Sequence, residues 1–100
     1  MIDATDLTFK DEIQNGLVLV DVYTPTCGPC RTQARTLEQC ENIVKIVKLN
    51  GEEYPEVAMM ELGVRKVPTL IWYKNGIELK RTTGLQSLED ITATVKELTD

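Results

Sequence analysis

The residues with the clearest chemical capacity are two cysteines at positions 27 and 30, separated by Gly28 and Pro29. A CxxC pair beside a strand and a helix predicts redox chemistry, because its two sulfurs can be joined in a disulfide. Closing so short a loop contributes only ~2 kcal/mol of chain entropy, against ~3 kcal/mol for a loop of about 15 residues. Such a bond suits reversible switching better than stabilisation of a fold.

The CxxC lies between an apolar run at residues 17–23 and a helical pattern. This pattern repeats at spacings of four, three and three residues, at Cys30, Ala34, Leu37 and Cys40. The helix therefore begins at the CxxC, and Pro29 can start it without wasting a donor. Cys27 precedes the first turn, where free N–H groups and the helix dipole favour a thiolate. We expect Cys27 to attack, Cys30 to resolve, and Gly28 to let a partner's backbone approach.

The remaining composition excludes several other chemistries. The sequence contains no His, so Cys–His nucleophiles, His bases and His-containing zinc sites cannot form. A closed zinc site needs four ligands and only Cys40 remains beside the pair, so we expect no metal. Cys40 is instead expected to be a small buried hydrophobe rather than a regulatory thiol. A net charge of −5 disfavours binding to nucleic acid or to anionic membranes.

Length and patterning predict a single domain over residues 1–100, because 100 residues with 42% hydrophobic side chains can supply one core. No window approaches the ~20 apolar residues that span a bilayer, and residues 1–10 lack the pattern of a signal peptide. Three cysteines are too few for a disulfide-stapled secreted scaffold. We therefore expect a cytoplasmic protein, and a monomer.

Alternating strand and helix patterns predict the rest of the fold. After the first strand and the CxxC helix, the expected elements are a strand over 43–49, a short helix over 55–62, strands over 69–73 and 77–83, and a helix from residue 88. Asn75-Gly76 predicts that the last two strands form an antiparallel hairpin. The expected class is α/β, with a central mixed sheet of four to five strands and helices on both faces.

Capping residues predict where two of the helices begin. Thr5 or Asp6 can cap a first short helix, which Gly16 would end. Ser87, followed by Asp90 three residues later, can cap the last helix. Residues 1–3 contain too few apolar side chains to decide whether they add an edge strand.

Several separate positions then show that the chain resembles the thioredoxin family over nearly its whole length. The family carries the same Cys-Gly-Pro-Cys and a buried Asp six residues before its first Cys, here Asp21. Its Lys on the next core strand matches Lys48, and its active-site cis-proline matches Pro68. A glycine near the family's substrate groove matches Gly84. The resemblance implies a thioredoxin-like fold and a dithiol–disulfide oxidoreductase that reduces disulfides in cytoplasmic proteins.

The resemblance also implies partners and roles. It indicates no bound cofactor, disulfide-bearing protein substrates, and electrons from a flavin-containing thioredoxin reductase. The implied catalytic residues are Cys27, Cys30, Asp21 and Lys48. The implied substrate-binding residues are Gly28, Pro29, Val67, Pro68 and Gly84.

The position of Asp21 predicts a role even without the resemblance to the family. It interrupts an apolar strand, so desolvation is expected to raise its pKa and let it exchange a proton near neutral pH. The residues alone equally allow an Asp bound to a backbone donor or to a Lys; the resemblance favours proton transfer with Cys30. Lys48 alone would be a solvated charge on a strand. Pro68 could be a turn proline, although the strand that follows and the family match favour a cis site.

Two of the departures from the family's pattern concern recognition of partners. Thr26 occupies the place of a Trp before the first Cys, and Lys66 occupies a place where a small Gly is common. Both changes are expected to affect recognition of reductase and substrates more than the chemistry. Two further functions stay open: a binding module that holds one partner in its groove, and a dedicated electron donor to a single enzyme.

Overall fold

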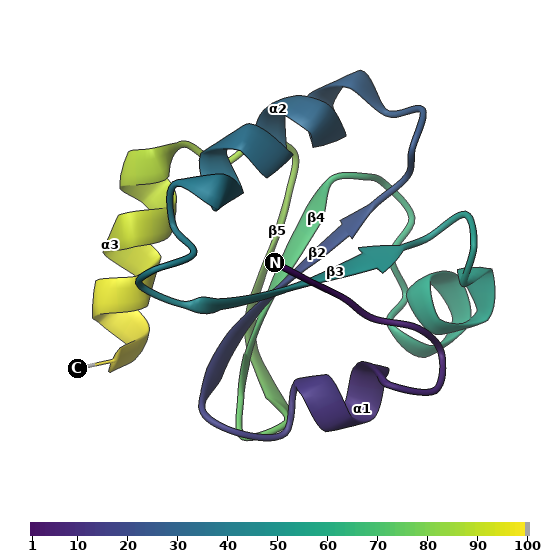
Figure 1. The fold of residues 1–100 in the computed structure, drawn as a ribbon, viewed down its shortest axis with the longest axis horizontal. Helices are drawn as coiled ribbons and strands as arrows, with labels where there is room; N and C mark the ends of the chain where they lie inside the picture. Colours follow the sequence, from purple (N-terminus) through teal and green to yellow (C-terminus); the bar gives the residue numbers. More distant parts are fainter. Residues whose placement is uncertain (100) are drawn as a thin grey trace.

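The computed structural model describes residues 1–99, and its strands form one five-stranded sheet in the order β1-β3-β2-β4-β5 (Figure 1). The strands are β1 (Ile2–Asp3), β2 (Leu17–Tyr23), β3 (Lys45–Asn50), β4 (Thr69–Lys74) and β5 (Ile77–Thr83). Strand β3 runs parallel to β1 and β2, whereas β4 runs antiparallel to β2 and β5. The predicted mixed sheet is confirmed, and the first residues supply its fifth strand.

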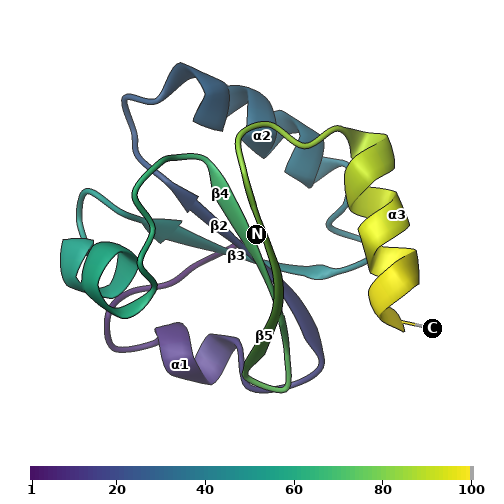
Figure 2. The same cartoon turned by 180° about the vertical axis from the view of Figure 1, so that it is seen from behind.

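Helices cover both faces of the sheet, as predicted. They are α1 (Phe9–Glu12), α2 (Gly28–Glu38), the π-helix η1 (Glu56–Glu61) and α3 (Leu88–Thr99). Figures 1 and 2 show α1 and η1 on one face and α2 and α3 on the other. None of these helices in residues 1–99 is long and apolar enough to cross a membrane.

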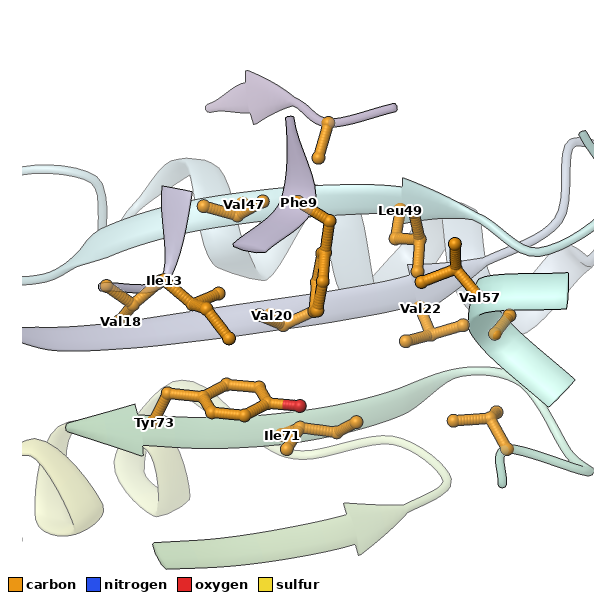
Figure 3. Close-up of a cluster of buried hydrophobic side chains, with 13 residues drawn as sticks. Phe9, Ile13, Val18, Val20, Val22, Val47, Leu49, Val57, Ile71 and Tyr73 are labelled. Carbon is orange, nitrogen blue, oxygen red and sulfur yellow. The ribbon is translucent and has the colours of Figure 1, made fainter. Parts of the chain in front are cut away.

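The alternation of side chains along β2 divides the core in two. Val18, Val20 and Val22 join the cluster that contains Phe9 of α1 (Figure 3). Leu19 instead joins the cluster beneath α2 and α3. Each fully buried aliphatic side chain contributes about 1.5–3 kcal/mol relative to exposure. Because successive strand residues point to opposite faces, the side chain of Asp21 lies on the face that α2 covers.

Two predicted elements differ in detail from those observed. The second strand starts at Lys45 and not at residue 43, because the N–H of Ile43 donates to the carbonyl of Cys40 in a turn after α2, at 3.0 Å. The predicted short helix is η1, a π-helix in which the N–H of Leu62 donates to the carbonyl of Val57 five residues back, at 2.9 Å. Apolar spacing alone does not distinguish such a turn from an α-helical one.

The predicted cap is present at α3 but not at α1, whose N-cap residue is Thr8 and has no side-chain cap hydrogen bond. Of the two candidates at the first, Thr5 binds the turn that leads into α1, its Oγ1 accepting from the N–H groups of Leu7 and Thr8 at 3.1 and 3.3 Å. At α3 the cap is reciprocal: Asp90 N–H donates to Ser87 Oγ at 3.1 Å, and Ser87 N–H donates to Asp90 Oδ2 at 3.2 Å.

The hairpin between β4 and β5 turns at Asn75-Gly76, where φ is 50° and 84°. Both angles lie in the left-handed region that a two-residue hairpin turn of this kind requires. Asn75 Oδ1 also accepts from the N–H of Gly16 at 2.8 Å, which fastens the turn to the start of β2. The hairpin and Pro68 therefore lie at opposite ends of β4.

Candidate functional site

The two cysteines occupy the first turn of α2, as the sequence predicts. Cys27 is the N-cap residue and forms a disulfide with Cys30, with 5.2 Å between their Cα atoms. The N–H of Cys30 donates to Cys27 Sγ at 3.1 Å, and Pro29 lies in the first helical turn. Cys27 is half-buried, whereas Cys30 is only 3% exposed. Cys27 is thus the sulfur that a partner can reach, and its negative charge would have a backbone donor.

The loop before β4 brings Val67, one of the expected substrate-binding residues, to this sulfur. The Val67–Pro68 peptide bond is cis, and the carbonyl oxygen of Val67 lies 3.8 Å from Cys27 Sγ. The N–H of Gly84 donates to the carbonyl of Pro68 at 2.9 Å. Gly84 has a φ of 91°, so a side chain there would strain the backbone beside Pro68. The Val67 carbonyl therefore borders the sulfur, and the bond from Gly84 holds the Pro68 backbone behind it.

Asp21 is completely buried and lies opposite Lys48 in the register of β2 and β3. Burial raises the pKa of Asp21 from 3.8 to about 6, and the positive charge of Lys48 opposes this rise without cancelling it. The predicted direction is therefore confirmed. Within residues 1–99 neither carboxylate oxygen has a hydrogen-bond partner, so the alternative of an Asp bound to a backbone donor is not found.

Lys48 contacts an aromatic ring that the sequence interpretation did not single out. Its Nζ lies 4.3 Å from the centroid of the Tyr23 ring, in a cation–π contact. Lys48, Tyr23 and Cys30 are among the residues that line one hollow of about 130 Å³. Lys48 and the inner cysteine therefore border the same hollow. The only signal for Tyr23 was an aromatic residue two positions after Asp21, on the same side of a strand.

Gln33 was also missed, and it connects α2 to the segment before α3. Its side chain is fully buried, with Nε2 donating to the carbonyl of Gln86 at 3.1 Å and Oε1 accepting from the N–H of Gln86 at 2.8 Å. A Gln three residues after Cys30, on the buried side of the helix, was the available signal. This pair of bonds fixes the helix that carries both active cysteines.

The third cysteine lies apart from this site. Cys40 is fully buried, its S–H donates to the carbonyl of Thr36 at 3.5 Å, and burial raises the pKa of its thiol. Its predicted burial is confirmed. In the part of the chain that the structure describes, no three His, Cys, Asp or Glu side chains are placed to hold a metal ion.

The two departures from the family's pattern flank the reactive sulfur. Thr26 directly precedes Cys27 in the chain, and its side chain is exposed. Lys66 is also exposed and directly precedes Val67, whose carbonyl borders Cys27 Sγ. Their predicted effect on recognition of a partner stays a prediction.

An oxidised CxxC pair at a helix start, beside a cis-proline loop and in front of a buried carboxylate, defines a dithiol–disulfide oxidoreductase. The family model "Thioredoxin" matches residues 1–97. The chain is 36% identical over 99 residues to thioredoxin 1 of Nostoc sp., covering 93% of this chain and 92% of that protein. It is 34% identical to the thioredoxin of Listeria monocytogenes, covering 95% of each. The chain belongs to the thioredoxin family.

Solved structures agree with this assignment. A mutant thioredoxin from Halobacterium salinarum has the same fold, with a TM-score of 0.92 at 24% identity, over 99% of this chain and 90% of that one. A chloroplastic thioredoxin z gives a TM-score of 0.88 at 26% identity, over 99% and 94%. The predicted fold and the predicted oxidoreductase activity are both confirmed.

Proposed function

We propose that the protein acts as a cytoplasmic monomer that reduces disulfides in other proteins and is itself reduced by a flavin-containing thioredoxin reductase. One observation carries the proposal: the accessible Cys27 sulfur lies 3.8 Å from the Val67 carbonyl, with Cys30 buried behind it. An extended substrate can therefore lie along Val67, Pro68 and Gly84 while its disulfide meets Cys27. The exposed residues Gly28 and Pro29 would form the other border of this surface.

The first step begins from the reduced pair. The Cys27 thiolate attacks one sulfur of the substrate disulfide and forms a mixed disulfide with it. The substrate S–S bond breaks, and its second sulfur leaves as a thiolate that takes a proton from solvent. The N–H of Cys30, which already points at Cys27 Sγ at 3.1 Å, stabilises the attacking charge before this step.

The second step releases the substrate. Cys30 gives its proton to the Asp21 carboxylate and attacks Cys27 Sγ, so that the substrate's remaining sulfur leaves and is protonated. Two electrons have then passed to the substrate, and the Cys27–Cys30 disulfide has formed. A pKa of about 6 suits Asp21 to this role, since the group is mostly ionised near pH 7 and still basic enough to accept a proton. Lys48 would keep the carboxylate ionised between turnovers.

A trapping experiment tests the order of attack. In Cys30→Ser the mixed disulfide cannot be resolved, so substrate proteins should stay linked to Cys27 and be released by a dithiol. Cys27→Ser, which retains Cys30 and the buried Cys40, should trap few or none. Equal trapping by the two variants would contradict the assignment. A biological effect retained when both cysteines are replaced would instead indicate the binding module.

A reduction potential tests the direction of electron flow. Equilibration of the Cys27–Cys30 pair with a glutathione or dithiothreitol buffer should give a value near the cytosolic poise or below it, about −270 mV, which is typical of thioredoxins. A potential near −120 mV would make the protein an oxidant and would overturn the proposal. Strong activity with one enzyme and weak activity with generic disulfides would identify a dedicated donor.

A further inference from the structure

We propose, resting on the function above, that a basic hollow beside the cis-proline loop binds an acidic side chain next to the attacked half-cystine of the substrate. The basic hollow measures about 220 Å³ and is lined by residues 63–66, Thr69, Arg81 and Thr83. Substrates with Asp or Glu at this position would be reduced faster than substrates with Lys or Arg there.

The position of Lys66 places the basic hollow within reach of the reacting disulfide. Lys66 directly precedes Val67, whose carbonyl oxygen is 3.8 Å from Cys27 Sγ. Adjacent Cα atoms are only about 3.8 Å apart, so a peptide that lies along Val67 presents its next residue to Lys66. A hydrogen bond fixes the backbone at Lys66, because Thr69 Oγ1 donates to the Lys66 carbonyl at 2.6 Å.

The free positive charge of the basic hollow comes from Arg65 and Lys66. Arg81 forms one wall but is already neutralised, since its Nε and Nη2 donate to the Glu78 carboxylate at 2.9 and 2.7 Å. Its Nη1 donates to the carbonyl of Leu62 at 2.7 Å. Arg65 and Lys66 are exposed, and within residues 1–99 neither forms an ion pair. Two cations without an ion-pair partner in residues 1–99 therefore line the basic hollow.

This local charge is opposite in sign to that of the whole chain, which carries −5. A partner with general positive charge would be drawn to the acidic remainder of the surface, but a basic residue beside its disulfide would be repelled by Lys66. An acidic residue at the same place would be attracted. The loop therefore selects the charge next to the disulfide independently of the partner's overall charge.

The expected preference for an acidic over a basic substrate residue can be worked out from the strength of exposed ion pairs. Each such pair changes an affinity by about 1.5- to 5-fold, so two cations give a preference of about 2- to 25-fold in kcat/KM at low salt. Screening shortens the range of these charges to about 8 Å at physiological salt, so the preference should shrink by half or more in about 0.5 M NaCl.

The test uses three fluorogenic peptide disulfides that differ only in the residue beside one cysteine, which is Glu, Gln or Lys. Reduction by the full-length protein is measured with each, and every rate is divided by the rate with free dithiothreitol, which removes differences in intrinsic reactivity. The wild type should prefer the Glu peptide to the Lys peptide. Lys66→Glu should bring this ratio close to one, because its charge offsets that of Arg65, and Lys66→Gln should give an intermediate ratio.

Lys74→Glu is the matched control, because it makes the same change in net charge at the far end of β4, in a residue that is also exposed. Its Glu-to-Lys ratio should stay within about twofold of the wild-type ratio, since Lys74 lies beyond the screening length. A wild-type ratio near one, or an equal change in Lys74→Glu and Lys66→Glu, would overturn the inference. Failure to reduce even the Gln peptide would instead overturn the proposed function on which it rests.

Discussion

Replacing Asp21 with Asn should have a more favourable effect on the stability of the oxidised protein at neutral pH than near pH 3.5. The carboxylate is fully buried, and burial raises its pKa from 3.8 to about 6. The native state thus holds this proton more tightly than the unfolded chain does. The free energy of unfolding therefore falls as the pH rises from 3.8 to about 6, and the loss is complete above that range.

The difference between these two pKa values corresponds to a loss of about 3 kcal/mol in the free energy of unfolding. The amide side chain introduced by Asp21→Asn does not ionise, so the variant escapes this loss. The stability of the variant relative to the wild type should therefore grow between pH 3.8 and about 6, and above that range it should exceed its value near pH 3.5 by about 3 kcal/mol. An unpaired amide in the same place adds a cost that does not depend on pH and so cancels from the comparison between two pH values.

Guanidinium unfolding of both proteins across this pH range, followed by Trp72 fluorescence, measures the difference directly. The oxidised form is the right one to use, because neither active cysteine titrates in it. A stability difference that stays the same from pH 3.5 to 8 would refute the reasoning, since it would mean that Asp21 has an ordinary pKa in the native state. Reduction kinetics give a second readout: the wild-type rate should rise with pH around 6, and the variant should lose that dependence.

Two further changes test the parts of the site that hold and present the cysteines. Gln33→Ala should lower the free energy of unfolding by about 1–3 kcal/mol, because it leaves the N–H and carbonyl of Gln86 without their partners. Thermal unfolding measures this loss. A loss below about 0.5 kcal/mol would contradict the prediction. Gly28→Ala should leave the unfolding midpoint almost unchanged, since an added Cβ meets no atom within 4 Å, but should slow reduction of a folded protein relative to a small disulfide. Equal slowing of both substrates would count against close approach at Gly28.

Much of this structure could be predicted because its signals are local. The apolar run of β2, the Asn75-Gly76 turn and the Ser87–Asp90 cap each depend on a few neighbouring residues, and all three are found as expected. The start of β3 was misplaced because Ile43 is apolar yet belongs to the turn after α2. Apolar character alone does not distinguish a turn residue from a strand residue.

The site was predictable only in part. The accessibility of Cys27 and the burial of Cys30 follow from helix geometry, and the pKa rise of Asp21 follows from its apolar neighbours. The contact between Lys48 and Tyr23 and the bonds between Gln33 and Gln86 depend on how separate elements are packed together. No spacing rule along the chain encodes those distances, so the tertiary structure was required to find them.

The complete burial of Cys40 affects how quickly alkylating reagents can label this thiol. Its side chain is 0% exposed at the end of α2, whereas Cys27 is accessible. Alkylating reagents that label Cys27 in the reduced protein cannot reach Cys40 until the surrounding cluster opens. The rate at which this last sulfhydryl is modified therefore reports the opening of the core, without an engineered label.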